Sequence, residues 1–216
     1  MENLNDNNDM KNLIEEIIKT EWAFFDKVKN EGGRAECQDD FRTFSIMRRS
    51  QYMAWSPAML ESWRADLREA AEDENGRNPM TEKYGYMMCI SDPEANAELA
   101  KLLPYVSEEQ RCAARRITEK LLPQNEAFRK KYPHVAGCGR PLRTSEEKAA
   151  GVTSIETYEL GELCTYSTRT LALFERHLAE LERSGISYPE RVIENSLIQR
   201  GFTGLAQAED YIAAKK

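Results

Sequence analysis

Apolar residues recur at three- and four-residue intervals along most of the chain, which is the spacing of amphipathic helices. The first such segment covers residues 10–30. Gly32-Gly33 is expected to end it, because glycine adopts the left-handed backbone of a helix C-cap. A second segment covers about residues 41–55, with Asp40 as its expected N-cap. The chain therefore opens with two predicted helices joined by a short polar loop.

Local start and stop signals predict the remaining helices. Ser56-Pro57 begins one that ends near Asn75-Gly76, residues 80–90 form a short one, and Asp92-Pro93 begins one that ends before Pro104. The capping box Ser107-Glu108-Glu109-Gln110 opens a helix to Tyr132, in which Pro123 is expected to cause a kink or break. A second capping box, Thr153-Ser154-Ile155-Glu156, opens a long helix that continues to about Arg183. The next helix begins at Ser187-Tyr188-Pro189 and ends at Gly201. A last helix covers about residues 204–214.

No segment shows the period-two alternation of a strand, and the longest irregular stretch is residues 133–153. The sequence predicts an all-α protein: a single globular multi-helix domain of about 7–9 helices, over residues 10–216, with two long polar loops. Residues 1–9 are predicted to be a disordered tail because they are rich in Asn and Asp. A soft subdivision near residues 104–107 is the alternative to an undivided domain.

Composition narrows the possible environments and partners. Hydrophobic residues make up 41% of the chain and charged residues 31%, as expected for a folded domain with a highly charged surface. The net charge of −7 disfavours binding to nucleic acids or to anionic membranes. Five cysteines without a CxxC motif favour a reducing cytoplasm, and neither a signal peptide nor a membrane span is recognisable. We therefore expect a cytoplasmic protein without a membrane association.

The first polar loop, residues 31–40, concentrates charged residues between two helices. Arg34 is a candidate for binding a phosphate or carboxylate group, since a guanidinium can form two parallel hydrogen bonds to it. Asp39 is a candidate to orient a ligand, hold a cation or act as a base. The alternative is structural, with Asp40 capping a helix and Arg34 paired with an acidic neighbour.

Two charged residues interrupt apolar helix faces. Arg48 shares a face with Phe41, Phe44, Tyr52 and Trp55, and Glu21 lies among isoleucines and phenylalanines. A buried guanidinium needs a partner, so Arg48, with its neighbour Gln51, is a candidate for ligand binding. Glu21 is a candidate proton carrier because burial raises the pKa of a carboxyl group. A structural Glu21–Arg48 ion pair is the alternative for both.

The second polar stretch runs from Tyr132 to Arg143 and continues from Thr153 to Glu162. Arg140 and Thr153 are candidate ligand-binding residues, because this glycine-containing loop leads into a helix N-terminus, where free N–H groups attract anions. Glu162 is a candidate proton carrier that tyrosine hydroxyls on its helix face could orient. An ordinary ordered loop is the alternative for this stretch.

A divalent metal is a further alternative, because Glu156, Glu159 and Glu162 form an ExxExxE ladder on one helix. The same spacing is common on solvated helices, and capping already explains Glu156. No metal ligand is therefore assigned. Cys37 and Cys138 lie in the polar loops, but no Cys–His spacing indicates a nucleophile.

The same two polar stretches resemble an uncharacterised bacterial family, domain of unknown function 4125. The resemblance is carried by Glu31-Gly-Gly-Arg-Ala with Cys37-Gln-Asp-Asp, Met47-Arg-Arg-Ser-Gln51, Tyr132-Pro, Ala136-Gly137, Gly139-Arg-Pro, Thr153-Ser-Ile-Glu-Thr-Tyr and Gly161-Glu-Leu. It extends over most of the chain. Cys138 departs from a bulkier or basic position in that pattern. The resemblance implies no activity.

Two functional hypotheses follow from these residues. The first is an intracellular enzyme or small-molecule-binding protein, in which the two polar stretches converge on one pocket lined by arginines and carboxylates for an anionic ligand. The alternative is a helical protein–protein interaction or accessory module without catalysis. A nucleic-acid binder is the least favoured class because of the net charge.

Overall fold

Capping side chains begin the long helices of the computed structural model, which describes residues 2–30 and 32–215. The backbone N–H of Thr43 donates to the Asp40 carboxylate (2.9 Å), and the N–H of Met59 donates to the Ser56 hydroxyl. Ser107 and Gln110 form both hydrogen bonds of a capping box. These predicted helix starts are confirmed.

Helices account for all regular structure in the described residues. The longer ones are α1 (Glu2–Phe25), α2 (Phe41–Tyr52), α3 (Pro57–Glu72), α4 (Pro79–Ser91), α6 (Glu108–Lys131), α9 (Ile155–Leu163), α10 (Thr168–Arg183), α11 (Tyr188–Gln199) and α12 (Leu205–Ala213). Single-turn helices are α5 (Ala97–Ala100), α7 (Pro133–Ala136) and α8 (Glu147–Ala150), and two short 3-10 turns are η1 (Glu36–Asp39) and η2 (Thr144–Glu146). The all-α class is confirmed.

The twelve α-helices of the described chain exceed the predicted 7–9 for two reasons. Single turns such as α5, α7 and α8 are too short to show helical periodicity. In addition, the long helix predicted from 153 to 183 is divided into α9 and α10, because Ser167 caps a new helix through the N–H of Thr170 (3.2 Å).

Three further local predictions need correction. The second capping box does not form: Ser154 is the N-cap of α9, accepting from Thr157 N–H (3.0 Å), while Glu156 binds Thr144 instead. Pro123 lies inside an uninterrupted α6. The first helix spans Glu2–Phe25 instead of residues 10–30; Met1 lies outside the described residues.

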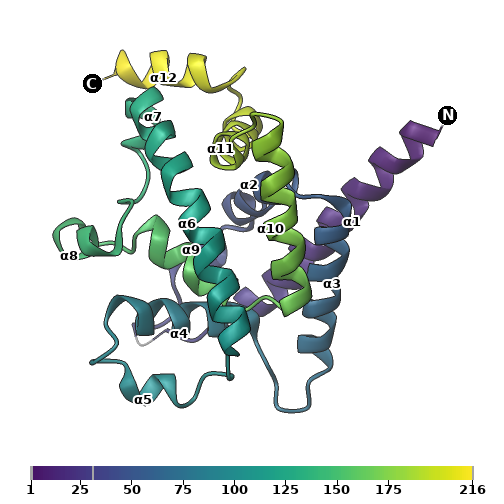
Figure 1. Cartoon of the computed structure of the whole chain (residues 1–216), viewed down its shortest axis with the longest axis vertical. Coiled ribbons are helices and arrows are strands. Elements are labelled where there is room, and N and C mark those ends of the chain that lie inside the picture. Colours follow the sequence, from purple (N-terminus) through teal and green to yellow (C-terminus); the bar gives the residue numbers. More distant parts are fainter. Residues whose placement is uncertain (1, 31, 216) are drawn as a thin grey trace.

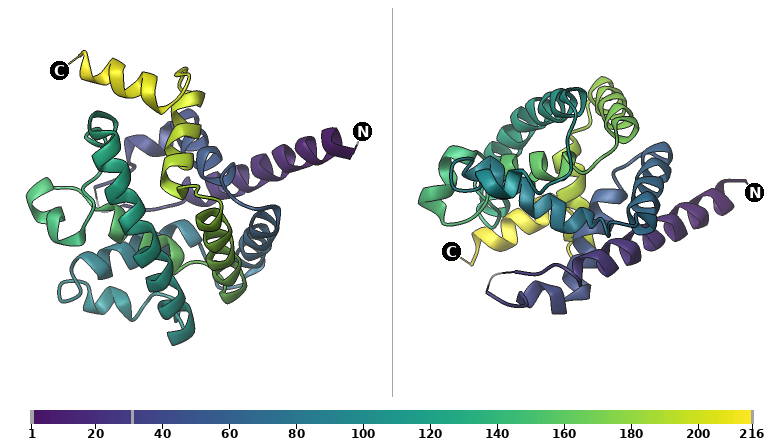
Figure 2. Two further views of the ribbon diagram at one scale, coloured as in Figure 1. Left: turned by 45° about the horizontal axis from the view of Figure 1, so that its top comes forward. Right: turned by 90° about the horizontal axis from the view of Figure 1, so that it is seen from below.

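One hydrophobic core joins the two halves of the chain into a single domain. Its fully buried members come from α1, α3, α6 and α10 and include Ile17, Trp63, Ile117 and Leu171. The core therefore crosses residues 104–107, where a soft subdivision was the alternative. Figure 1 shows α6 and α10, which pack against each other, beside α9, α11 and α2, while the N-terminal end of α1 projects from the body in both views of Figure 2.

A smaller apolar cluster closes the C-terminal end. Phe128 of α6 and Val135 of α7 pack there with Leu197 of α11 and Leu205 of α12. This cluster holds the C-terminal half of α6 against α11. None of the described helices combines the length and apolarity that crossing a membrane requires.

Candidate functional site

Arg48 lies at the centre of a buried polar network on the inner face of α2. It is 5% exposed, and its Nε and Nη2 atoms donate to the two carboxylate oxygens of Glu21 at 2.7 and 2.5 Å. Nη2 also donates to the Tyr52 hydroxyl, and Nη1 donates to Gln51 and Glu162. These contacts use all five N–H groups of the guanidinium. Arg48 therefore keeps no donor for a ligand.

Glu21 of α1 is completely enclosed behind Arg48. In addition to the arginine, its carboxylate accepts from the Tyr52 hydroxyl (2.5 Å) and from the indole N–H of Trp63 (3.1 Å). Its burial is possible because both carboxylate oxygens accept hydrogen bonds, three at Oε1 and one at Oε2, and because Arg48 neutralises the charge. Glu21 thus forms the structural ion pair that was the alternative to a proton carrier.

Glu162 of α9 is the second carboxylate of the network. It accepts from Arg48 at 3.0 Å, Gln51 at 2.8 Å and the Tyr166 hydroxyl at 2.6 Å, and it forms an ion pair with Lys83 of α4. Burial acts to raise the pKa of Glu162, but Arg48 and Lys83 outweigh burial and hold that pKa well below its ordinary value. Glu162 is therefore a permanent carboxylate rather than a proton carrier.

Close packing of α4 against α9 brings Lys83 to this carboxylate. Gly161 makes the approach possible, because a Cβ at that position would overlap Met87 and lie 3.1 Å from the carbonyl oxygen of Lys83. The Lys83 ammonium is 2% exposed and lies 3.8 Å from the centre of the Tyr158 ring. Burial lowers the pKa of Lys83, but Glu162 overcomes that effect and leaves the pKa raised.

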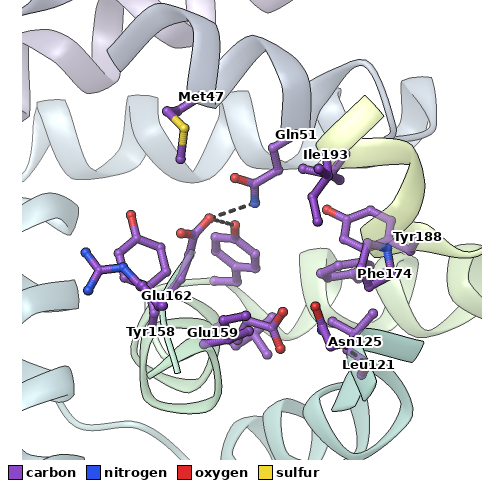
Figure 3. A pocket seen from close by; sticks show the side chains of 16 residues that line it. Met47, Gln51, Leu121, Asn125, Tyr158, Glu159, Glu162, Phe174, Tyr188 and Ile193 are labelled. Atoms are coloured by element: carbon purple, nitrogen blue, oxygen red, sulfur yellow. Dashed lines mark hydrogen bonds between the residues drawn. The ribbon is translucent and has the colours of Figure 1, made fainter. Parts of the chain in front are cut away.

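A cavity of about 320 Å³ borders the network on the side of α9 (Figure 3). Its walls come from α2, α6, α9, α10 and α11 and from the turns that follow α7 and α9. The lining residues are Met47, Gln51, Leu121, Asn125, Arg140, Ile155, Tyr158, Glu159, Glu162, Leu163, Tyr166, Phe174, Tyr188, Pro189, Val192 and Ile193. Met47 and Arg140 are exposed and therefore mark the open side.

Glu159 is the exceptional group of this cavity. Its Oε2 atom is buried and has no hydrogen-bond partner among the described residues, although the residue as a whole is half-buried. Figure 3 shows its carboxyl group beside Asn125, on the opposite side of the cavity from Gln51. Burial first, and then the Glu162 carboxylate, raise the pKa of Glu159 to about 8, while Asn125 favours its charged form.

A family model described as a protein of unknown function (DUF4125) matches residues 11–210. This chain belongs to that family. No curated protein and no solved structure matched it. The matched range contains every residue that lines the cavity. For this DUF4125 protein, the functional interpretation therefore depends on the chemistry of the residues themselves.

The remaining predicted residues of the second stretch lie at the mouth of the cavity. Arg140 lies 5.3 Å from the centre of the Tyr158 ring, and its Nη1 donates to the carbonyl oxygen of Thr153 at 3.1 Å. Thr153 itself does not line the cavity and contributes only that carbonyl. The structure thus brings Arg48, Gln51, Glu162 and Arg140 of the DUF4125 protein to one place.

Residues 32–40 of the first polar stretch do not line this cavity, whereas its continuation on α2 contributes Met47 and Gln51, so the two stretches meet only through α2. Arg34 forms exposed ion pairs with Asp26 (2.6 Å) and Asp39 (2.8 Å). Gln38 is buried beneath them, where its amide donates to the carbonyl oxygens of Phe25 and Val28. The loop is thus a self-satisfied connection between α1 and α2, and Glu31 lies outside the described residues.

The glutamate ladder does not form a metal centre in the described chain, in which no group of three or more His, Cys, Asp or Glu side chains could hold an ion. Glu156 accepts from the N–H and hydroxyl of Thr144, and Glu162 is occupied by the network. Only Glu159 of the three remains open. The sequence interpretation named Glu159 only as a member of the glutamate ladder, although its position four residues from both Ile155 and Leu163 placed it on an apolar face.

This arrangement can hold a proton or a positive charge beside an apolar space. The neighbouring network is rigid because its donors and acceptors are mutually satisfied. Gln51 adds a second amide N–H at the cavity wall, since one of its two N–H groups already donates to Glu162. The chemistry of the site is therefore concentrated on Glu159.

Proposed function

We propose that this protein binds a small organic molecule in the cavity between α2, α6, α9 and α11, with Glu159 as the group that recognises it. One observation carries this proposal: Glu159, which has a buried carboxyl oxygen without a hydrogen-bond partner, lines a cavity of about 320 Å³. Leaving such a group unsatisfied typically costs about 1–3 kcal/mol, and more when it is charged. A ligand that completes its hydrogen bonding removes this cost.

The size and lining of the cavity limit the ligand. Its volume equals that of roughly ten water molecules, at about 30 Å³ each, which is at the small end of ligand sites. Leucine, isoleucine, valine and phenylalanine side chains form much of the wall. A compact ligand with an apolar body and one polar group matches this combination.

The expected anionic ligand loses most of its support. Arg34 is remote from the cavity, and every N–H of Arg48 is already used within the protein. Arg140 is the one arginine in the lining, and it is exposed at the mouth. An anion would therefore depend on a single, solvent-screened guanidinium.

The carboxyl group of Glu159 would also suit an enzymatic role in the same cavity. A carboxyl group with a pKa of about 8 exchanges its proton near neutral pH, which is what general acid–base catalysis requires. Such a role places Glu159, and not Glu21 or Glu162, as the proton carrier. We propose the cytoplasm as its location because all five cysteines are free.

A thermal-shift screen of small amines, alcohols, amino acids, nucleotides and carboxylic acids tests the proposal. A ligand at a hundred times its dissociation constant stabilises the folded state by about 2.7 kcal/mol. Ile193→Trp should abolish such shifts because the indole fills the cavity, while Leu102→Trp, on an exposed side chain outside the cavity, should retain them. Hits that survive Ile193→Trp would contradict binding in this cavity.

A protein-interaction module is the second candidate function. Leu102 and Tyr105, after α5, are each 82% exposed, which is unusual for large apolar side chains in adjacent turns. Replacing both with serine should change self-association or partner binding if this surface docks a protein. Unchanged behaviour in light scattering and in binding to a copurified partner would remove this candidate.

A further inference from the structure

We infer that the ligand of this cavity is an organic cation, a primary or secondary amine on an apolar body, whose ammonium group forms an ion pair with Glu159. This inference rests on the proposed function and adds the ligand's chemical class. Three features of the described residues support it: the charge balance of the network, the open carboxyl oxygen and the aromatic lining.

The charge balance leaves one carboxylate in excess. Glu21 and Glu162 are neutralised by Arg48 and Lys83, so these two anions and two cations form a closed set. Glu159 lies next to this set and forms no ion pair with a cation of the described residues. A charged Glu159 in this position needs a positive partner, because an unpaired buried ion costs several kcal/mol.

The open oxygen determines where that partner would bind. Oε2 of Glu159 is buried and unsatisfied, and the hydroxyl of the neighbouring Tyr166 is already donated to Glu162. Asn125 donates one amide N–H to the carbonyl oxygen of Leu121 at 3.1 Å, and its interaction with Glu159 favours the charged carboxylate but supplies no positive charge. An ammonium group brings up to three N–H donors and a positive charge together, so it satisfies both deficits of Glu159 at once.

The aromatic lining suits a cation with an apolar body. Tyr158 already carries Lys83 on its ring at 3.8 Å and Arg140 at 5.3 Å, which shows that cations are accommodated along this wall. Phe174 and Tyr188 line the opposite part of the cavity and lie 5.2 Å apart between ring centres. Ring faces attract cations and also pack against an apolar body.

Two other ligand classes fit less well. A carboxylate or phosphate would face the oxygens of Glu159 and Glu162 and would have only the exposed Arg140 to bind. A magnesium ion would need several oxygen ligands in octahedral geometry. The four donors on Glu162 leave it no lone pair for a metal.

Amine binding would be coupled to pH. A protonated Glu159 must release its proton before it can pair with an ammonium ion, so affinity should rise with pH until Glu159 is fully ionised. With a pKa of about 8, the dissociation constant should fall by about tenfold between pH 6 and pH 7 and level off above about pH 8.

The other ionisable groups around Glu159 give this titration its background. They are Glu156, Tyr158 and Glu162 on α9, Tyr166 in the turn after it, Arg48 on α2, Lys83 on α4, Arg140 in the loop and Tyr188 on α11. The pKa of Glu162 is lowered, and the pKa values of Lys83, Arg48 and Tyr188 are raised above the ordinary values of these side chains, so none of these four groups titrates near neutral pH. On the remaining walls, α6 and α10 present the uncharged Asn125 and Phe174.

A matched set of probes tests the inference. 3-Phenylpropan-1-amine, 3-phenylpropan-1-ol and 3-phenylpropanoate share a phenyl ring on a three-carbon chain and differ in the charge of the head group. Titration calorimetry with the full chain should show the amine binding at least about tenfold more tightly than the alcohol, a difference of about 1.4 kcal/mol. The propanoate should bind most weakly, and amine binding should release a proton near neutral pH.

Glu159→Gln provides the specificity control because the amide has nearly the same shape without the charge. It should weaken amine binding by about tenfold, abolish its pH dependence and leave alcohol binding unchanged. Glu119→Gln, on the exposed side of α6, should change neither the affinity for the amine nor its pH dependence. Thermal unfolding of each variant confirms that the fold is retained.

The outcomes separate this inference from the function on which it rests. If the alcohol or the propanoate binds as tightly as the amine or more tightly, the amine assignment is overturned. The proposed ligand binding in the cavity is still supported in that case, provided that Ile193→Trp abolishes binding of the alcohol or propanoate. Amine binding that is independent of pH, or unchanged in Glu159→Gln, overturns the ion pair. Absence of amine binding at millimolar concentration overturns the inference, while the wider thermal-shift screen decides the proposed function.

Discussion

Replacing Glu159 with glutamine should stabilise the protein, by an amount that grows with pH. Burial and the Glu162 carboxylate raise the pKa of Glu159 from 4.5 to about 8. Between these values the folded protein keeps a proton that the unfolded chain releases, so the stability of the wild type falls as the pH rises. Glutamine removes this loss because its amide resembles the protonated acid and does not ionise.

The structure sets the magnitude of this effect. Each unit of pKa shift corresponds to about 1.4 kcal/mol, so the full difference between 4.5 and about 8 gives an upper bound of about 5 kcal/mol. Glu159 is only half-buried as a residue, and solvent reaches the cavity from its open side. We therefore expect about half of that bound, roughly 2–3 kcal/mol in favour of the variant near pH 8, after allowing for solvent screening.

Urea unfolding followed by tryptophan fluorescence, from about pH 5 to about pH 8, measures the difference between the two proteins. It should be near zero at the acidic end and increase steadily with pH. The variant Glu119→Gln should show no such trend, because Glu119 is exposed on α6. A difference that stays constant with pH, or a Glu159→Gln protein less stable than the wild type near pH 8, would refute the reasoning.

Three further changes test the frame around the cavity, each by the free energy of urea unfolding. Arg48→Gln should cost about 3–5 kcal/mol because it leaves the buried Glu21 carboxylate without its cation, while Glu162 keeps only Lys83. Arg111→Gln, which breaks an exposed pair, should cost less than about 1 kcal/mol, and equal losses would contradict the network. Gly161→Ala should cost about 1–3 kcal/mol because backbone atoms of α4 lie 3.1 and 3.2 Å from the added Cβ, whereas Gly32→Ala, with open space around it, should be nearly neutral. Glu147→Gln should destabilise the protein at neutral pH and progressively less toward pH 2. Burial acts to raise the pKa of Glu147, but hydrogen bonds from serine and threonine lower this pKa to about 2. The stabilisation that the Glu147 carboxylate provides is therefore lost as the pH falls from 4.5 toward 2. A loss that does not depend on pH would contradict this.

Helix starts were predictable because capping chemistry is local. Ser56, Ser107 and Ser187 each accept a hydrogen bond from an N–H three residues later, and the side chain and its partner are both visible in the sequence. The break between α9 and α10 was not predicted, because apolar spacing continues across Ser167. The uninterrupted α6 around Pro123 shows that packing against α9, α10 and α11 can override a local breaker.

The network was partly predictable for a different reason. A charge within an apolar stripe must be paired, so Arg48 and Glu21 stood out from their helix faces alone. Their common partner set was not predictable, since Lys83 and Glu162 lie 79 residues apart in sequence and meet only because α4 packs against α9. The role of the first polar loop was not predictable for the same reason. A high density of charged residues in a loop does not reveal whether their ion-pair partners lie in or beside that loop, as those of Arg34 do.

The distribution of unsatisfied atoms is the strongest reason to assign function to the cavity. Among the described side chains, only the Thr118 hydroxyl and Oε2 of Glu159 are buried without a hydrogen-bond partner. When Glu159 is ionised, its carboxylate is the more costly of the two, because burying an unpaired charge costs more than burying a neutral hydroxyl. A leucine at position 159 would remove that cost without disturbing the Glu21–Arg48–Glu162 set. Because Glu159 lines the cavity, the proposed ligand would supply the interaction that offsets this cost, whereas the described residues around Oε2 supply no hydrogen bond to it.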